Sequence, residues 1–113
     1  QPVINGDGKQ TRDYVFVEDI VRANLLATEK EVSGAFNIGT SVETDVNEIF
    51  RLVNGAFGTD WQEVHGSPRA GEQKTSSLSY KKAKEVLGWD PTVTVEEGIR
   101  KTVEWFLEHP ERV

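Results

Sequence analysis

Four segments with apolar residues at helical spacing constrain the fold of this chain more than any other feature. They span residues 19–30, 44–57, 79–87 and 95–108. The clearest is 44–57, where apolar side chains recur every three or four residues, at Val46, Ile49, Phe50, Val53 and Phe57. Gly58 follows directly and predicts the end of that helix. Thr94 and Glu97 match a capping box at the start of the last helix.

Short runs of β-prone residues separate these helices. Residues 2–5, 14–17 and 35–38 are predicted strands, and a weaker signal covers 61–65. Asp19 is placed to cap the first helix, whereas residues 66–78 carry Gly and Pro and are typical of a loop. We therefore expect one α/β domain over residues 1–113, with short strands, about four helices, and Trp89, Trp105 and Phe106 in its core.

The composition excludes several classes of function. The formal net charge of -6 argues against nucleic-acid binding, which needs clustered Lys and Arg. The chain has no Cys, so disulfides and thiolate chemistry are excluded, and no apolar run approaches the ~20 residues of a membrane span. His65 and His109 have no carboxylate pattern around them that would predict a metal site. These features fit a cytoplasmic protein.

Two short patterns resemble catalytic motifs but are better explained otherwise. Residues 6–11 suggest a phosphate-binding loop, yet Val3 stands at the required first Gly and Gln10 replaces the hydroxyl residue. Tyr80 and Lys84 have the spacing of a short-chain dehydrogenase pair, but no Gly-rich dinucleotide fingerprint precedes them. We therefore interpret the first pattern as a turn between strands and the second as an exposed helix face.

The chain contains no Met, although a translated reading frame begins with one. Its first residues already resemble an internal segment of a folded domain. We therefore expect these residues to be a piece of a longer protein.

Four blocks along the chain resemble the extended short-chain dehydrogenase/reductase family in the order in which the family carries them. They are GDGKQTRDYVFVEDIVRA at 6–23, FNIGT at 36–40, RAGE at 69–72 and a final block over 82–106. The pattern is most similar to the UDP-glucose 4-epimerases of that family, which also includes nucleotide-sugar dehydratases. The resemblance implies the C-terminal, substrate-binding part of such an enzyme, without the dinucleotide-binding Rossmann half.

The resemblance also implies candidate residues for substrate binding. Arg12 and Arg69 match two arginines that contact the substrate diphosphate, and a guanidinium suits phosphate oxygens. Glu72 matches an acidic residue that binds the ribose hydroxyls. Val3 and Asn5 match positions that flank the uracil, largely through backbone groups. The plainer alternatives are a surface ion pair between Arg12 and Asp13, and a flexible loop at 69–72.

The resemblance sets the expected function, cofactor and partners. We expect a substrate-side domain that binds a UDP-sugar, with NAD as the cofactor of the whole enzyme, no cofactor in this chain, and no catalytic residue in it. The alternative is a stand-alone, non-catalytic nucleotide-binding or oligomerisation domain. We also expect a homodimer, because apolar surface at Ile20, Ala23 and Ala27 and in the strands 14–17 and 36–38 would lack a covering domain.

Overall fold

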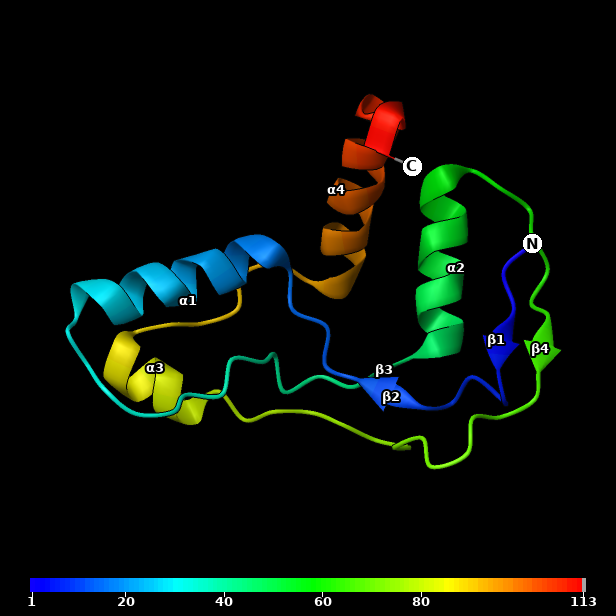
Figure 1. Ribbon diagram of the computed structural model, residues 1–113. Coiled ribbons are helices and arrows are strands. Elements are labelled where there is room, and N and C mark those ends of the chain that lie inside the picture. The colour runs from blue at the N-terminus through cyan, green and yellow to red at the C-terminus, as the bar shows by residue number, and fades with distance from the viewer. Residues whose placement is uncertain (113) are drawn as a thin grey trace.

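The computed structural model describes residues 1–112, which form four helices and four very short strands (Figure 1). The helices are α1 (Val17–Glu29), α2 (Val46–Phe57), α3 (Lys81–Leu87) and α4 (Val95–Glu108), followed by the 3-10 turn η1 (Pro110–Arg112). The strands are β1 (Ile4–Asn5), β2 (Thr11–Arg12), β3 (Thr44–Asp45) and β4 (His65–Gly66). The expected α/β class with short strands and about four helices is confirmed.

The strands form two separate pairs. β1 pairs with β4 in parallel, with Asn5 opposite Gly66. β2 pairs with β3 in antiparallel orientation, with Arg12 opposite Thr44. Both pairs join segments that are far apart in the sequence, so they hold the turn between β1 and β2 against the rest of the molecule.

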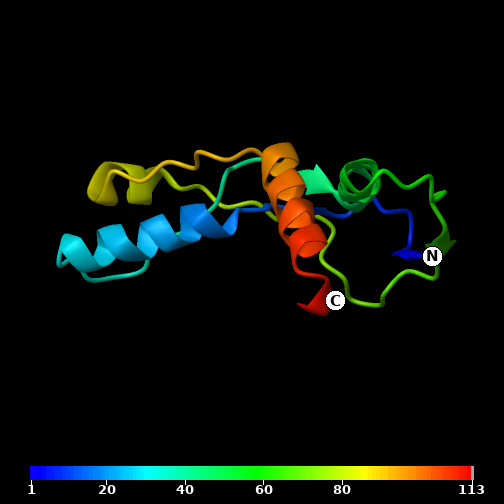
Figure 2. The same cartoon turned by 90° about the horizontal axis from the view of Figure 1, so that it is seen from above.

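The molecule is elongated, with α1 and α3 at one end and α2, β1 and β4 at the other (Figures 1 and 2). Its extents are 47 × 36 × 20 Å and its radius of gyration is 16.4 Å. A compact domain of this length has a radius of gyration of about 13 Å. The chain is therefore more open than a self-contained domain of its size.

The core between α1 and α3 is built around Trp89. Its indole is fully buried with Ala23, Ala83 and Leu87, and the ring of Tyr80 meets it edge to face, with 5.7 Å between ring centroids. The expectation that Trp89 lies in the core is confirmed.

Trp105 and Phe106 do not belong to the core, which corrects the expectation for both. They lie near the end of α4 with 45% and 37% of their surface exposed. Trp105 packs edge to face on Phe106 and stacks on His109, whose ring centroid is 4.4 Å away. Phe106 still borders the hollow that Ile49 and Val53 of α2 line, whereas Trp105 borders a separate hollow beside Phe16 and Val17.

The ends of α2 and α4 follow the sequence signals. The Asp45 carboxylate accepts the Glu48 amide at 2.7 Å to cap α2, and Gly58 ends that helix in the left-handed conformation, with φ 67°. Thr94 caps α4 by accepting the Glu97 amide at 3.3 Å. Only half of the predicted capping box forms, because the Glu97 carboxylate binds Arg100 instead.

The predicted strands at 14–17 and 35–38 are wrong. Both segments are irregular except for Val17, which already begins α1, and Phe16 is the residue that precedes that helix. Asp19 is accordingly the third residue of α1 and not its cap. A β-prone run forms a strand only where another strand offers hydrogen bonds, and neither run meets one here.

The exposed apolar face of α1 also differs from the expected one. Ala23 is buried and Ala27 and Ile20 are partly buried, because α3 and Trp89 pack against that side. The exposed stripe consists instead of Val17, Val21 and Leu25, which expose 63%, 51% and 58% of their surface. Over residues 1–112 no helix combines the length and the apolar character that crossing a membrane requires.

Candidate functional site

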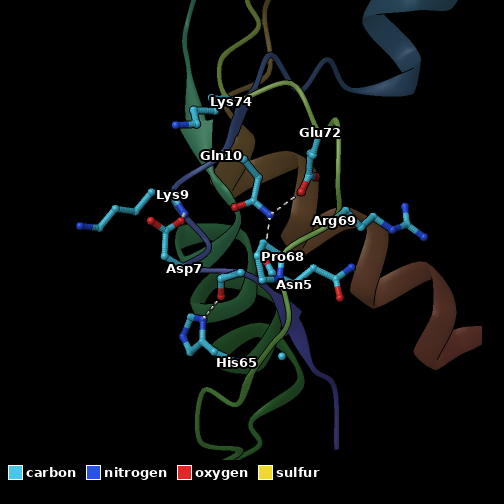
Figure 3. Close-up of a pocket in the computed structure, with 11 residues that line it drawn as sticks. Asn5, Asp7, Lys9, Gln10, His65, Pro68, Arg69, Glu72 and Lys74 are labelled. Atoms are coloured by element: carbon cyan, nitrogen blue, oxygen red, sulfur yellow. Dashed lines mark hydrogen bonds between the residues drawn. The ribbon is translucent and has the colours of Figure 1, made fainter.

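A polar groove of about 640 Å³ lies between the β1–β2 turn and the loop that follows β4 (Figure 3). Two backbone hydrogen bonds join these two segments. The Gly6 amide donates to the Gly66 carbonyl at 3.1 Å, and the Thr11 amide donates to the Lys74 carbonyl at 2.8 Å. The groove is lined by Asn5, Gly6, Asp7, Lys9, Gln10, His65, Gly66, Pro68, Arg69, Glu72 and Lys74.

The turn at 6–8 needs its glycines for two reasons. Gly6 and Gly8 both have a positive φ, of 70° and 71°. A Cβ added to Gly8 would lie 1.8 Å from the Asn47 side-chain oxygen, so the turn packs directly on the first turn of α2. The Asn47 backbone amide donates to the Gly8 carbonyl at 3.2 Å, and the Asn47 side-chain amide donates to the Asp7 carbonyl at 3.0 Å.

These contacts exclude a phosphate-binding loop at this turn. The turn leads into β2 and not into a helix, and the Asn47 amide at the start of α2 is already used by Gly8. The other motif-like pair is engaged in structure as well. Tyr80 packs on Trp89, and the Lys84 ammonium lies 3.1 Å from the Asp90 carboxylate.

Arg12 is fixed by the backbone on both sides of the groove. Its Nη1 donates to the Thr11 carbonyl at 2.7 Å and to the Gln73 carbonyl at 2.8 Å. Its Nη2 lies 3.7 Å from Glu72 Oε1, and the two side chains are 35% and 28% exposed. Arg12 therefore pairs with Glu72 and not with Asp13, and two of the predicted site residues meet although 60 positions separate them.

Asp13 has a structural role beside Arg12. Its carboxylate accepts hydrogen bonds from the Thr40 amide and hydroxyl at 2.8 and 2.6 Å, and from the amides of Ser41 and Leu78 at 3.0 and 3.1 Å. Burial alone would raise the pKa of Asp13, but these hydrogen bonds outweigh it and lower the pKa. The clamp holds two loops against the end of β2 and so fixes the backbone from which Arg12 projects.

Gln10 is a residue that the sequence analysis did not assign to the site. Its side-chain amide donates to the Asn5 carbonyl at 3.0 Å and lies 3.5 Å from Glu72 Oε2 (Figure 3). It thereby connects Asn5 on β1 with Glu72 on the opposite loop. The available signal was its position two residues before Arg12, since side chains at i and i+2 of an extended segment lie on one face.

The other two predicted residues lie at the edges of the groove. Arg69 lines it, but its side chain extends away from Glu72 (Figure 3). Val3 faces a neighbouring apolar hollow of about 640 Å³, which includes Phe50, Phe57 and Trp61. That hollow shares Asn5, Gln10 and Glu72 with the groove. The structure thus brings Asn5, Arg12 and Glu72 together and places Arg69 and Val3 on either side.

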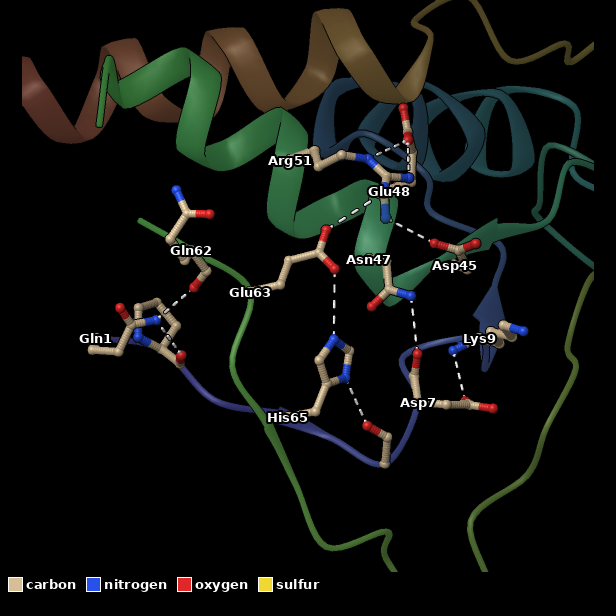
Figure 4. Close-up of polar contacts among 12 residues, drawn as sticks. Gln1, Asp7, Lys9, Asp45, Asn47, Glu48, Arg51, Gln62, Glu63 and His65 are labelled. Atoms are coloured by element: carbon tan, nitrogen blue, oxygen red, sulfur yellow. Dashed lines mark hydrogen bonds and ion pairs between the residues drawn. The ribbon is translucent and has the colours of Figure 1, made fainter. Parts of the chain in front are cut away.

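His65 lines the groove and supports the turn. Its Nδ1 lies 2.8 Å from the Gly6 carbonyl and its Nε2 lies 3.5 Å from the Glu63 carboxylate (Figure 4). Glu63 also pairs with Arg51 at 3.4 Å. His65 therefore has a hydrogen-bonding role, and within residues 1–112 no three His, Asp or Glu side chains gather as a set of metal ligands.

The charges of the groove differ from those of the whole chain. Lys9, Arg69 and Lys74 line it and Arg12 lies at its edge, against only two carboxylates, Asp7 and Glu72. The groove is thus rich in cations although the chain carries a net charge of -6. Such a surface suits an anion that also offers hydroxyl groups to a carboxylate.

Comparison with known proteins gives a consistent picture. Residues 1–102 match the family model described as GDP-mannose 4,6 dehydratase. The chain is 46% identical over 104 residues to the UDP-glucose 4-epimerase of Mycolicibacterium smegmatis, which covers 91% of this chain and 33% of that protein. The chain spans about a third of the length of the curated relatives it matches.

Solved structures match in the same way. The UDP-glucose 4-epimerase of Thermotoga maritima, solved with UDP-glucose, is 50% identical with a TM-score of 0.91, over 96% of this chain and 35% of that one. The UDP-glucuronic acid 4-epimerase of Bacillus cereus, solved with UDP-glucuronic acid and NAD, is 25% identical with a TM-score of 0.84. That match covers 94% of this chain and 35% of the other. The resemblance drawn from the four sequence blocks is confirmed.

Proposed function

This chain belongs to the GDP-mannose 4,6 dehydratase family, and from that premise we propose that it is the substrate-side domain of a UDP-sugar epimerase. In this proposal the groove beside β1 and β2 holds the nucleotide diphosphate of a UDP-sugar. Chemistry on the sugar takes place in a longer protein that also carries the NAD-binding part. The domain alone is inactive.

The observation that carries the proposal is that Asn5 and Glu72 line one groove and that Arg12 pairs with Glu72 beside it. Arg12 offers a planar cation that is already held in place by two backbone carbonyls, which suits a diphosphate. Glu72 offers a carboxylate for the two ribose hydroxyls, and Arg69 on the same loop adds a second cation. The backbone of Asn5 and the apolar surface at Val3 are the assigned neighbours of the uracil.

The described residues do not fit NAD. A dinucleotide site needs a Gly-rich turn that opens a helix, so that the helix N-terminus meets the pyrophosphate. The Gly6–Gly8 turn opens β2, and the amide of Asn47 that faces it is already bonded. We therefore assign NAD to residues other than those described here, and no step of the proposed binding depends on it.

The test is a titration of the isotope-labelled chain with UDP, followed by NMR. We expect weak binding, with Kd in about the millimolar range, because the domain supplies only part of an enclosing pocket. Changes in NMR chemical shift should be concentrated at the backbone amides of residues 4–12 and 66–74. Arg12→Ala should abolish them, whereas Arg100→Ala, which removes an exposed arginine on α4, should leave them intact. In the complete enzyme Arg12→Ala should raise KM by about 10-fold or more, the loss of about 1.4 kcal/mol of binding.

A second candidate is a stand-alone domain that binds nucleotides or assembles without chemistry. The exposed stripe of Val17, Val21 and Leu25 on α1 is the observation in its favour, because it offers an apolar surface for another copy. Mass spectrometry of the natively produced protein separates the two candidates. A mass about three times that of the present chain, in line with the relatives' length, supports the epimerase.

A further inference from the structure

Glu72, which lines the groove, forms an ion pair with Arg12 that competes with the proposed ligand. Arg12 uses Nη1 for two hydrogen bonds to backbone carbonyls, so that Nη2 and Nε are the donors left for an anion. Glu72 Oε1 already lies 3.7 Å from Nη2. An incoming anion and the Glu72 carboxylate therefore compete for the same cation.

We propose that Glu72 acts as a built-in competitor for Arg12, so that the groove selects ligands that carry both a diphosphate and a vicinal diol. This inference rests on the proposed function and adds a specificity-determining role for Glu72. A bare anion that binds Nη2 must displace Glu72 and offers its carboxylate no new partner. A nucleoside diphosphate displaces it in the same way but offers two ribose hydroxyls that can donate to it.

The position of Glu72 supports this exchange. Its second oxygen lies 3.5 Å from the Gln10 side-chain amide, which is itself anchored on the Asn5 carbonyl at 3.0 Å. Glu72 borders both the polar groove and the apolar hollow beside Val3. A ligand whose base lies in the hollow and whose diphosphate lies in the groove would bring its ribose to the boundary, where Glu72 and Gln10 stand.

The strength of the pair makes the competition measurable without blocking the site. Both side chains are about one third exposed, so the pair has the modest strength of a partly solvated ion pair. Loss of the carboxylate should therefore strengthen binding of a plain anion by about 3-fold. The same loss should weaken binding of UDP, because the ribose hydroxyls lose their acceptor.

The experiment measures the Kd of pyrophosphate, UDP and 2′,3′-dideoxy-UDP for the full chain by NMR titration. In Glu72→Gln we expect pyrophosphate to bind about 3-fold more tightly than in the unchanged chain. In Glu72→Ala, which also removes the acceptor oxygen that a Gln side chain would keep, we expect the preference for UDP over its dideoxy analogue to disappear. The control is Glu43→Gln, which removes the same charge from a residue that contacts Thr11 and not Arg12. It should change neither the Kd of pyrophosphate nor the preference for UDP over its dideoxy analogue.

The outcomes separate this inference from the proposed function. Unchanged or weaker pyrophosphate binding in Glu72→Gln would overturn the competition, even if UDP binds. Tighter pyrophosphate binding in Glu72→Gln together with no UDP binding in either protein would support the competition and refute the nucleotide site. An equal gain in pyrophosphate affinity in Glu43→Gln and Glu72→Gln would mean that the change in net charge explains the effect, and it would overturn the inference.

Discussion

The carboxylate of Asp19 accepts hydrogen bonds from both the amide and the hydroxyl of Thr92, at 3.0 and 2.7 Å, and so ties α1 to a loop 73 residues later. The Val93 amide and the Arg22 guanidinium add two more, at 3.1 and 2.7 Å. The backbone carbonyl of Asp19 also accepts the indole N–H of Trp89 at 2.8 Å. This buried aspartate organises the core between α1 and the segment that leads into α4.

Asp19→Ala should lower the free energy of unfolding by about 3 kcal/mol, because it leaves two partly buried amides, a hydroxyl and a guanidinium without their acceptor. Urea denaturation followed by circular dichroism measures the loss. Asp90→Ala is the matched control, since it removes an aspartate whose pair with Lys84 lies at the surface, and it should cost less than about 1 kcal/mol. Equal losses in the two variants would contradict the assigned role of Asp19.

The stability of the chain should fall in acid because of the same aspartate. Burial alone would raise the pKa of Asp19, but the hydrogen bonds from Thr92, Arg22 and Val93 lower it below the ordinary value. A carboxyl with a lower pKa in the folded chain stabilises the fold above its unfolded pKa, and this contribution is lost as the pH falls through the folded pKa. Unfolding free energies measured from about pH 6 to pH 2 should therefore decrease below about pH 4. In Asp19→Asn the decrease should be smaller, and an identical decrease would rule out Asp19 as its source.

Substitution of alanine at two glycines should change the stability of the chain in opposite directions. A Cβ at Gly39 would lie 2.7 Å from the Asp13 carboxylate and 2.7 Å from the Leu78 Cβ, so Gly39→Ala should destabilise the chain by about 2 kcal/mol. Gly55 lies within α2 with open space around its Cβ position, so Gly55→Ala should stabilise it by up to about 1 kcal/mol. Thermal unfolding of both variants tests the pair. A neutral Gly39→Ala would mean that the Asp13 clamp is looser than its contacts indicate.

The helices could be predicted from the sequence because their signals are local. The apolar spacing of 44–57 with Asp45 before it and Gly58 after it specifies both ends of α2. β1 lies within the predicted strand at 2–5, but β2 and β3 could not be predicted in this way, because each consists of two residues and depends on a distant partner. Tyr14 to Val17 has higher β propensity than Thr11 and Arg12, yet only the latter meet a strand, β3.

The site residues could be predicted from the sequence only through the family resemblance. No local pattern indicates that Arg12 lies 3.7 Å from Glu72, since that contact depends on the hydrogen bond that holds Lys74 beside Thr11. Gln10 was missed for the same reason. Its role exists only because Asn5 and Glu72 approach it from two different segments.

The outer face of α1 gives a reason to expect self-association. Val17, Val21 and Leu25 follow one another at intervals of four residues and form a continuous apolar stripe, each with more than half of its surface exposed. The opposite face is already covered by Ala83, Leu87 and Trp89. An uncovered stripe on an elongated molecule is a surface that another protein commonly covers.

We therefore expect the isolated chain to form a dimer through α1, since two stripes in antiparallel contact would each cover the other in a self-complementary interface. Light scattering at about 50 μM tests this, a concentration at which a dimer with a micromolar Kd is largely assembled. The monomer mass is 12.6 kDa, and we expect a mass twice that. Val21→Glu combined with Leu25→Glu should restore the monomer, because it places charges within the stripe, whereas Lys30→Glu at the exposed end of α1 should not. A mass of 12.6 kDa for the unchanged chain would mean that the stripe remains exposed to water in the isolated protein.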